Sequence, residues 1–160
     1  MGVSGSGKSH IGRQVAAAID ATFIDADDHH SADNIAKMAR GEPLNDDDRA
    51  AWLQTLSHLY RRYRSEGRSL VIGCSALKRH YRDLLRQGAP DLDILYLHGS
   101  RRLLLERLDA RDDHFFAGAH MLDNQLATLE VPDETEAFHC NIRSTPREIV
   151  ETFATNLRSS

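Results

Sequence analysis

Apolar and polar residues follow two different periods along this chain, and the two periods alternate. In several stretches an apolar residue recurs every four positions, as at Ile11, Val15 and Ile19, which marks one face of a helix. Short runs of consecutive apolar residues lie between these stretches and predict buried strands. The alternation predicts an α/β fold with a mainly parallel sheet. The predicted strands are 22–24, 70–72, 92–97 and 138–142. The predicted helices are 8–19, a short one with Ile35 and Met38 that stops near Gly41 and Pro43, 45–67, 77–86, one that carries Leu103, Leu104 and Leu108, and one opening at 145–148.

The segment Gly2–Ser9 fits the pattern G-x-x-x-x-G-K-[ST] of a phosphate-binding P-loop. Glycines let the backbone curl so that several N–H groups point into one concavity, and the next helix adds the positive end of its dipole. Lys8 would reach the β- and γ-phosphates of a nucleotide, and the Ser9 hydroxyl would hold Mg²⁺. The alternative is a flexible Gly/Ser-rich N-terminus. The predicted nucleotide-binding residues are Gly2, Val3, Ser4, Gly5, Ser6, Gly7, Lys8 and Ser9.

A P-loop directly follows a β-strand, and only Met1 stands in front of this one. We therefore expect Met1 to be the last residue of an apolar first strand that continues upstream and occupies the middle of the sheet. With that strand the sheet has five members. If the chain packs without it, we expect low stability, and a truncated, non-functional product is then an alternative.

Composition narrows the class of protein. The chain has 160 residues, of which 41% are hydrophobic and 28% charged, as expected for one globular domain over 1–160. The net charge of −4 is spread along the chain, which argues against a nucleic-acid partner. We find no membrane span and no signal peptide. Cys74 and Cys140 are too few for a disulfide framework, so a reduced, cytoplasmic location is predicted.

Two carboxylates follow the first predicted strand, at the sheet edge where α/β proteins bind ligands. Asp25 and Asp27 alternate like residues on one face of an extended segment, so both could point into a cleft. A kinase needs one carboxylate to accept the proton of the attacking hydroxyl and another near the Mg²⁺ waters. The alternatives are that these acids cap the next helix, or that His29 and His30 bind a metal, although no third ligand stands at a familiar spacing.

Two helix starts carry capping signals. Asn45 is followed by three acids, Asp46–Asp48, and Thr145–Glu148 forms a capping box with Pro at the first helical position. Read alone, Asn45–Asp48 is a solvated helix start. Arg49 could instead turn inward and bind an anionic substrate, since Arg suits a bidentate grip on a carboxylate.

Two further pairs of cations are spaced four residues apart. Lys78 and Arg82 would share a helix face near the end of a strand and suit a carboxylate or phosphate; the alternative is an ordinary amphipathic helix. Arg107 and Arg111 precede the polar segment 112–120, which could form a lid that closes over the nucleotide or simply a surface loop. The guanine-reading N-K-x-D of GTPases and the H-R-D and D-F-G motifs of protein kinases are absent.

These residues resemble the bacterial-type gluconokinases, small P-loop sugar-acid kinases related in fold to shikimate and nucleoside monophosphate kinases. The resemblance covers nearly the whole chain. It rests on Met1–Ser9, Asp25–His30, Lys37–Met38, Gly41–Arg49, Trp52–Leu53, Cys74–Lys78, His80–Arg86, Arg111, His114–Phe116, Met121–Leu122, Gln125 and Asp133–Thr135.

The resemblance implies a three-layer αβα fold and transfer of the γ-phosphoryl group of ATP to the 6-hydroxyl of D-gluconate with Mg²⁺. It also implies a cytoplasmic protein, with a homodimer as one of its states. Lys8, Asp27 and Arg111 would be catalytic, and Arg107 and Arg111 would add to the nucleotide site. Gluconate would meet Asp27, His30, Arg49, Lys78 and Arg82, the metal would meet Ser9 directly and Asp25 through water, and adenine would lie near 143–145.

Two other functions remain open on the same fold. The acceptor could be shikimate, another sugar acid or a nucleotide. A nucleotide-binding sensor without catalysis would keep Lys8 and the glycines, but it need not keep Asp27, Arg49 and Arg111, all of which are present. Their presence favours an enzyme.

Overall fold

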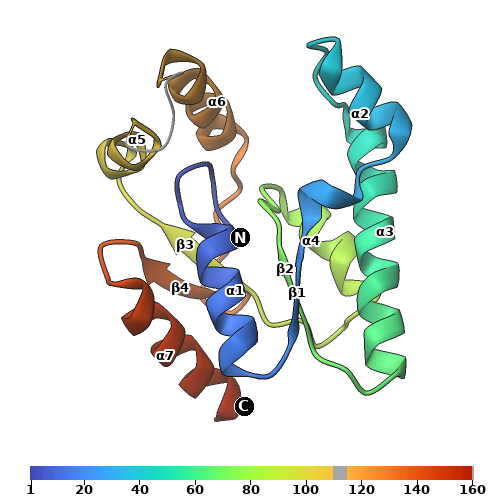
Figure 1. Cartoon of the computed structure of the whole chain (residues 1–160), viewed down its shortest axis with the longest axis vertical. Helices are drawn as coiled ribbons and strands as arrows, with labels where there is room; N and C mark the ends of the chain where they lie inside the picture. The colour runs from blue at the N-terminus through green and yellow to red at the C-terminus, as the bar shows by residue number, and fades with distance from the viewer. Residues whose placement is uncertain (110–114, 160) are drawn as a thin grey trace.

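The computed structural model describes the backbone of residues 1–109 and 115–159, and the side chains of 1–108 and 118–159. The fold is α/β with parallel strand pairs, as predicted (Figure 1). The elements are α1 Lys8–Ala18, β1 Thr22–Asp25, the 3₁₀ turn η1 Ala26–His29, α2 Ala32–Ala39, α3 Asp46–Ser65, β2 Leu70–Gly73, α4 Arg79–Arg86, β3 Leu95–His98, α5 Arg101–Asp109, α6 Phe115–Thr128, β4 Phe138–Asn141 and α7 Pro146–Arg158.

Both predicted N-caps are formed, but at Thr145 the Glu148 carboxylate accepts from the Thr145 hydroxyl (3.1 Å) and does not complete the predicted capping box. The Asn45 side chain accepts a hydrogen bond from the Asp48 amide while the Asp48 carboxylate accepts from the Asn45 amide, so a full capping box starts α3. Thr145 caps α7 through the Glu148 amide, with Pro146 at its first position. These local signals fix where the two helices begin because they satisfy amides that the helix leaves unpaired.

Three predicted boundaries are wrong. β3 starts at Leu95 rather than at 92, because Leu92 is still in a turn, with its amide donating to the Ala89 carbonyl. α4 starts at Arg79 rather than at 77, because Ala76 has a left-handed backbone (φ 48°) and Lys78 is the N-cap. Residues 115–120, predicted to lack regular structure, form the first turns of α6.

The strands form two separate parallel pairs, β1 with β2 and β3 with β4. The segment Met1–Gly2 lies between them. The Met1 amine donates to the Leu95 carbonyl (2.6 Å), the Leu97 amide donates to the Met1 carbonyl (3.0 Å), and the Gly2 amide donates to the Ser75 carbonyl (3.4 Å). Met1 therefore occupies the position predicted for the end of a central strand, bonded to β3 in the manner of a parallel ladder.

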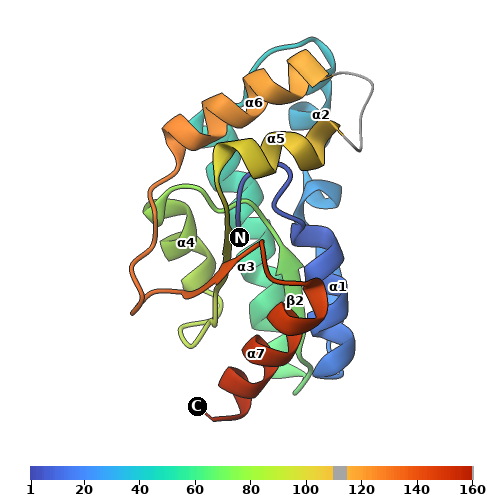
Figure 2. The same ribbon diagram turned by 90° about the vertical axis from the view of Figure 1, so that its left-hand side faces the viewer.

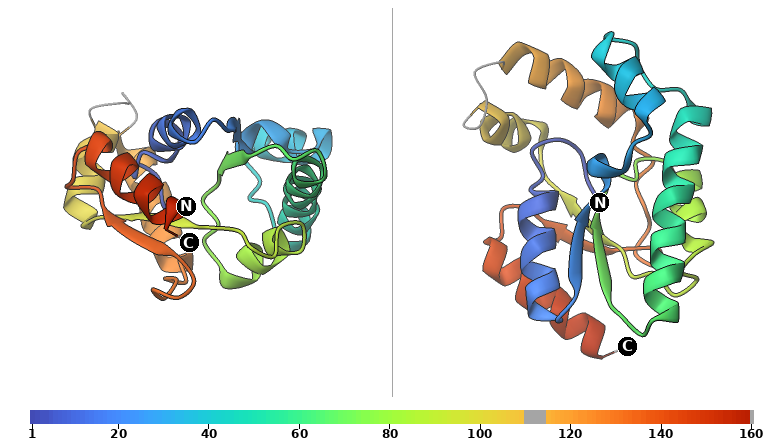
Figure 3. Two further views of the ribbon diagram at one scale, coloured as in Figure 1. Left: turned by 90° about the horizontal axis from the view of Figure 1, so that it is seen from below. Right: turned by 45° about the vertical axis from the view of Figure 1, so that its right-hand side comes forward.

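A cavity of about 460 Å³ lies next to Met1, between β2 and β3. Figures 1 and 3 show the two strand pairs on either side of this position. The cavity is far larger than the roughly 10–15 Å³ that one water needs. Its lining is mainly apolar and includes Ile11, Val15, Val71, Ile72, Leu85, Leu95, Leu97 and Phe153.

Two apolar clusters pack on the two strand pairs. One joins α1, β3, α5, α6 and α7 through residues such as Leu104, Leu122 and Phe153. The other joins α3, β2 and α4 around Leu53 and Leu56, and Met1 packs against it. Within the described residues, no helix has the length and apolar character needed to cross a membrane. The P-loop lies between the two apolar clusters, next to the carboxyl ends of β1 and β2.

In a chain that starts at Met1, burial of the Met1 amine predicts a pH dependence of the free energy of unfolding. Burial first, and the nearby Lys8 charge second, lower the pKa of this amine from 8.0 to about 5. Between those values the unfolded chain binds a proton that the folded chain does not. Stability should therefore rise with pH, by as much as about 4 kcal/mol between pH 5 and 8.

Denaturant unfolding across this pH range measures the effect. An N-terminally acetylated chain is the matched control, because it has no amine to titrate and keeps a donor for Leu95. We expect a flatter stability profile for the acetylated chain. Equal slopes for the two forms would contradict a buried, neutral amine.

Candidate active site

The P-loop has the backbone geometry that a phosphate cradle requires. Gly5 and Gly7 have left-handed backbones, with φ of 83° and 87°, which side chains other than glycine rarely allow. A Cβ on Gly5 would also lie 2.9 Å from the Leu104 carbonyl oxygen. Gly7 is the N-cap of α1 and gives no side-chain cap, so the first amides of α1 remain available to an anion.

The P-loop opens into a cleft of about 1300 Å³. Figure 2 shows α5 and α6 lying across one end of the molecule, above the N-terminal loop. The remaining walls come from α1, α3, the segment after β1 and the segment after β2. Of the predicted site residues, the cleft lining contains Ser4, Gly5, Gly7, Lys8, Ser9, Asp25, Asp27, His30, Arg49 and Arg107. Gly2, Val3 and Ser6 of the same loop are buried and do not line the cleft.

Ser9, Asp25 and Asp27 lie at the start of α1 and the end of β1. The Ser9 hydroxyl donates to Asp25 Oδ2 (3.1 Å), and the Asp27 amide donates to Asp25 Oδ1 (3.0 Å). Asp25 thus caps η1, as the capping alternative predicted, and also contacts Ser9. The Asp27 carboxylate is 85% exposed and faces the cleft. A hydroxyl beside a carboxylate fits Mg²⁺, which takes few protein oxygens and keeps waters and phosphate oxygens.

His30 stacks on Trp52, with ring centroids 4.3 Å apart, and Trp52 Nε1 is anchored on the Ala26 carbonyl (2.7 Å). Burial lowers the pKa of His30, Asp27 opposes this and Arg49 adds to it, so the ring is neutral near pH 7. Its buried Nδ1 has no hydrogen-bond partner among the described residues, as suits a group that meets a ligand hydroxyl. No metal-binding group of three His, Cys, Asp or Glu side chains is found in the described part of the chain.

Arg49 differs from Lys37 and Lys78 in forming no ion pair within the described residues, although its charge contributes to lowering the pKa of Asp46 and of Asp48. Lys37 pairs with Asp48 (2.7 Å), and Lys78 pairs with Asp46 (3.4 Å) at the rim, outside the cleft lining. Arg49 only donates a long hydrogen bond to the Tyr81 hydroxyl (3.4 Å), which itself donates to Asp46 (2.7 Å). Its guanidinium is therefore available to an anion in the cleft.

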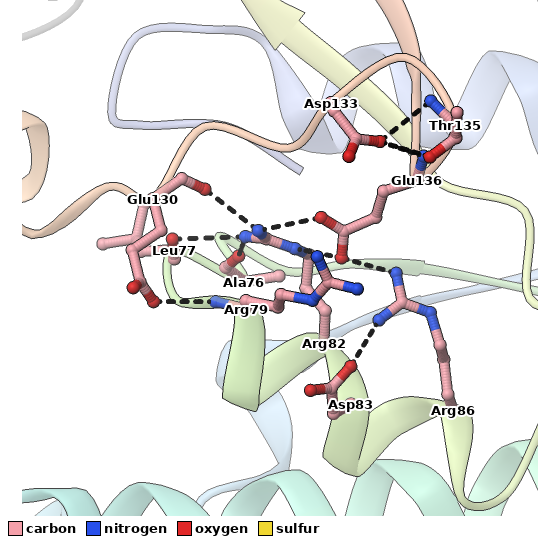
Figure 4. A network of polar contacts seen from close by, with 10 residues as sticks. All are labelled: Ala76, Leu77, Arg79, Arg82, Asp83, Arg86, Glu130, Asp133, Thr135 and Glu136. Atoms are coloured by element: carbon pink, nitrogen blue, oxygen red, sulfur yellow. Dashed lines mark hydrogen bonds and ion pairs between the residues drawn. The ribbon is translucent and has the colours of Figure 1, made fainter.

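Arg82 does not reach the cleft, and its predicted contact with substrate is not kept. The side chain is 1% exposed and makes a bidentate ion pair with Glu136 (Figure 4). The prediction relied on four-residue spacing from Lys78, but Lys78 is the cap of α4 rather than a helical residue. The long-range acid that binds Arg82 gives no local signal in the sequence.

The α5–α6 side of the cleft adds residues that sequence reasoning did not assign. Gln125 Oε1 accepts a hydrogen bond from the Ser4 amide (2.6 Å), so α6 touches the P-loop directly. Tyr81, Trp52 and Asn124 also line the cleft without having been predicted as site residues. Arg107 donates to the Ile142 carbonyl (2.5 Å), beside the predicted adenine loop. Arg111 and residues 112–114 of the predicted lid lie outside the described residues.

Comparisons with known proteins identify the family of this chain. Residues 1–132 match the family model described as an AAA domain. The chain is 49% identical over 144 residues to the thermoresistant gluconokinase of Escherichia coli (strain K12), covering 89% of this chain and 82% of the relative. The crystal structure of a gluconokinase from Sinorhizobium meliloti has a TM-score of 0.83 at 40% identity, covering 99% and 93%. A sugar kinase from Janibacter sp. gives 0.88 at 42%, covering 99% and 91%. This chain therefore belongs to the gluconokinase family of P-loop kinases.

Proposed function

We propose that this chain transfers the γ-phosphoryl group of ATP to the 6-hydroxyl of D-gluconate, giving 6-phosphogluconate and ADP. The observation that carries the proposal is that one cleft contains both the P-loop and Arg49, a cation that forms no ion pair within the described part of the chain. The first suits a nucleotide triphosphate, and the second suits the carboxylate of a sugar acid. Membership of the gluconokinase family supports the same reaction.

The nucleotide side of the proposal uses the P-loop amides, Lys8 and Arg107. Lys8 would neutralise charge on the β- and γ-phosphates as the γ-group moves. Ser9 would hold Mg²⁺ directly and Asp25 through water, and the bound ion would supply further charge neutralisation. Arg111 would add a lid cation from beyond the described residues.

On the acceptor side, Asp27 would orient the 6-hydroxyl and accept its proton. The hydroxyl oxygen bonds to the γ-phosphorus, the bond to the β–γ bridging oxygen breaks, and ADP leaves with that electron pair. Arg49 would hold the carboxylate, Lys78 would add charge at the rim, and His30 would meet a hydroxyl. We also propose that the protein is cytoplasmic and forms a homodimer.

The test is ADP release by the purified chain with Mg²⁺ and a panel of acceptors. Gluconate should be the best acceptor, with shikimate, other sugar acids and nucleotides far behind. A folded protein that binds ATP and prefers another acceptor would reassign the substrate. A folded protein that binds ATP but phosphorylates no acceptor of the panel would favour a nucleotide-binding sensor.

Arg49 gives this test a residue-level arm. Arg49→Met should raise the KM for gluconate about 10–100-fold, because a charge-assisted hydrogen bond contributes about 1.5–3 kcal/mol, and should leave the KM for ATP nearly unchanged. Arg62→Met, on an exposed face of the same helix, is the matched control. An unchanged gluconate KM in Arg49→Met would remove Arg49 from the acceptor site.

A further inference from the structure

Arg82 has an acceptor for each of its five guanidinium N–H groups (Figure 4). Nε donates to the Glu136 carboxylate (2.9 Å). Nη2 donates both to the Glu136 carboxylate (3.1 Å) and to the Glu130 carbonyl (2.9 Å). Nη1 donates to the carbonyls of Ala76 (2.8 Å) and Leu77 (3.2 Å). A buried cation with all five donors satisfied holds three backbone carbonyls in one fixed arrangement.

The carbonyls of Ala76 and Leu77 belong to the loop between β2 and α4. Residues 74–77 of this loop line the cleft that also contains Arg49, the residue proposed to hold the acceptor. Ala76 has a left-handed backbone, which non-glycine residues adopt only where the surroundings impose it. Arg82 supplies that constraint from below the loop, on the side away from the cleft.

The other partners of Arg82 come from the connection between α6 and β4. The Glu130 amide donates to the Leu77 carbonyl (2.8 Å), and the Glu130 carboxylate accepts from the Arg79 amide (2.9 Å). Burial alone would raise the pKa of Glu136, but hydrogen bonds from Arg82 and Arg86 outweigh it and lower the pKa, so this acid stays ionised. The loop is thus fastened to the segment that leaves α6.

We propose that Arg82 is a positioning residue for the acceptor: it fixes the loop 74–77 against the α6–β4 connection and so sets the wall that gluconate meets. The inference rests on the proposed function for the identity of the acceptor. It assigns Arg82 no contact with substrate. It predicts that loosening the guanidinium disturbs acceptor binding and transfer while nucleotide binding remains intact.

The test compares Arg82→Lys with Arg86→Gln. Lysine keeps the charge but cannot direct five donors, so the Ala76 carbonyl loses its bond to Nη1 and the Leu77 carbonyl keeps only its bond from the Glu130 amide. Arg86 also binds Glu136 (2.6 Å) but has no bond to the loop, so its variant reports general destabilisation. We expect kcat/KM for gluconate to fall about 10–100-fold in Arg82→Lys, as for misplacement by about 1 Å, with ATP affinity within about twofold of the parent. Arg86→Gln should keep the parental kcat/KM for gluconate and the parental affinity for ATP.

Amide exchange of residues 74–79 gives a readout that does not depend on the acceptor. It should speed up in Arg82→Lys relative to Arg86→Gln at matched global stability. If Arg82→Lys does not fold, Glu136→Gln weakens the same pair and should shift both readouts in the same direction. Unchanged exchange together with unchanged gluconate kinetics would overturn the proposal. A parent chain that ignores gluconate would overturn the proposed function instead, and exchange would still decide the role of Arg82.

Discussion

An Asp27→Asn chain is expected to phosphorylate gluconate about 10²–10⁴-fold more slowly than the parent, with kcat carrying most of the loss. The amide has nearly the same shape but cannot accept the proton of the attacking hydroxyl. Because the Asp27 side chain is exposed and only its backbone amide is hydrogen bonded, stability should change by less than about 0.5 kcal/mol. Steady-state kinetics with thermal melting separates these two effects.

Asp28→Asn is the matched control. It removes the same charge at the next residue, which is exposed and does not line the cleft. We expect the control to keep parental kcat. Equal losses in the two variants would indicate a general electrostatic effect, and a fully active Asp27→Asn would exclude a proton-accepting role for this carboxylate.

Five apolar residues added ahead of Met1 are expected to raise Tm by at least about 5–10 °C. Cavities destabilise by about 24 cal/mol per Å³, so filling the whole space between β2 and β3 would contribute on the order of 10 kcal/mol, similar to the net stability of a typical domain. About a quarter of this free energy is enough to raise Tm by about 5–10 °C in a chain of this size. The run should be continuously apolar, because both faces of the added strand meet apolar clusters.

A Gly/Ser extension of equal length is the control, since it also moves the N-terminal amine away from Leu95 but cannot fill apolar space. Thermal unfolding followed by circular dichroism compares the parent and the two extended forms. Gluconate-dependent ADP release in the same preparations shows whether the stabilised form is also the more active one. Superimposable melting curves for all three chains would refute the expectation.

Local chemistry made much of this fold predictable. The P-loop spacing and the N-caps at Asn45 and Thr145 depend on residues within a few positions of one another, and each is formed as predicted. The central position of Met1 followed from the requirement of a P-loop for a preceding strand. Such signals survive because the groups that satisfy one another are neighbours in the chain.

The errors and omissions at the site come from partners distant in sequence, whereas the wrong boundaries of β3 and α4 come from local backbone turns. Arg82 was assigned to substrate because its spacing from Lys78 suits a helix face, whereas Glu136, 54 residues away, determines where it lies. Gln125 meets Ser4 across 121 residues, and Tyr81 meets Asp46 across 35. Periodicity predicts which face of a helix or strand is buried, but not which residue of another helix or strand that face contacts.

The division of the sheet into two pairs has a consequence for how ligands act on this molecule. Among the described residues, Met1 and Gly2 bond to β3 and to the loop after β2, while α1 packs on β1, β2 and α7. The P-loop lies between Met1–Gly2 and α1, and each of these two segments contacts both sides of the divided sheet. An anion held there bridges the two sides, and ligand at 100 times its Kd adds about 2.7 kcal/mol to the folded state. A bound nucleotide would in this sense be a structural member of the domain as well as a reactant.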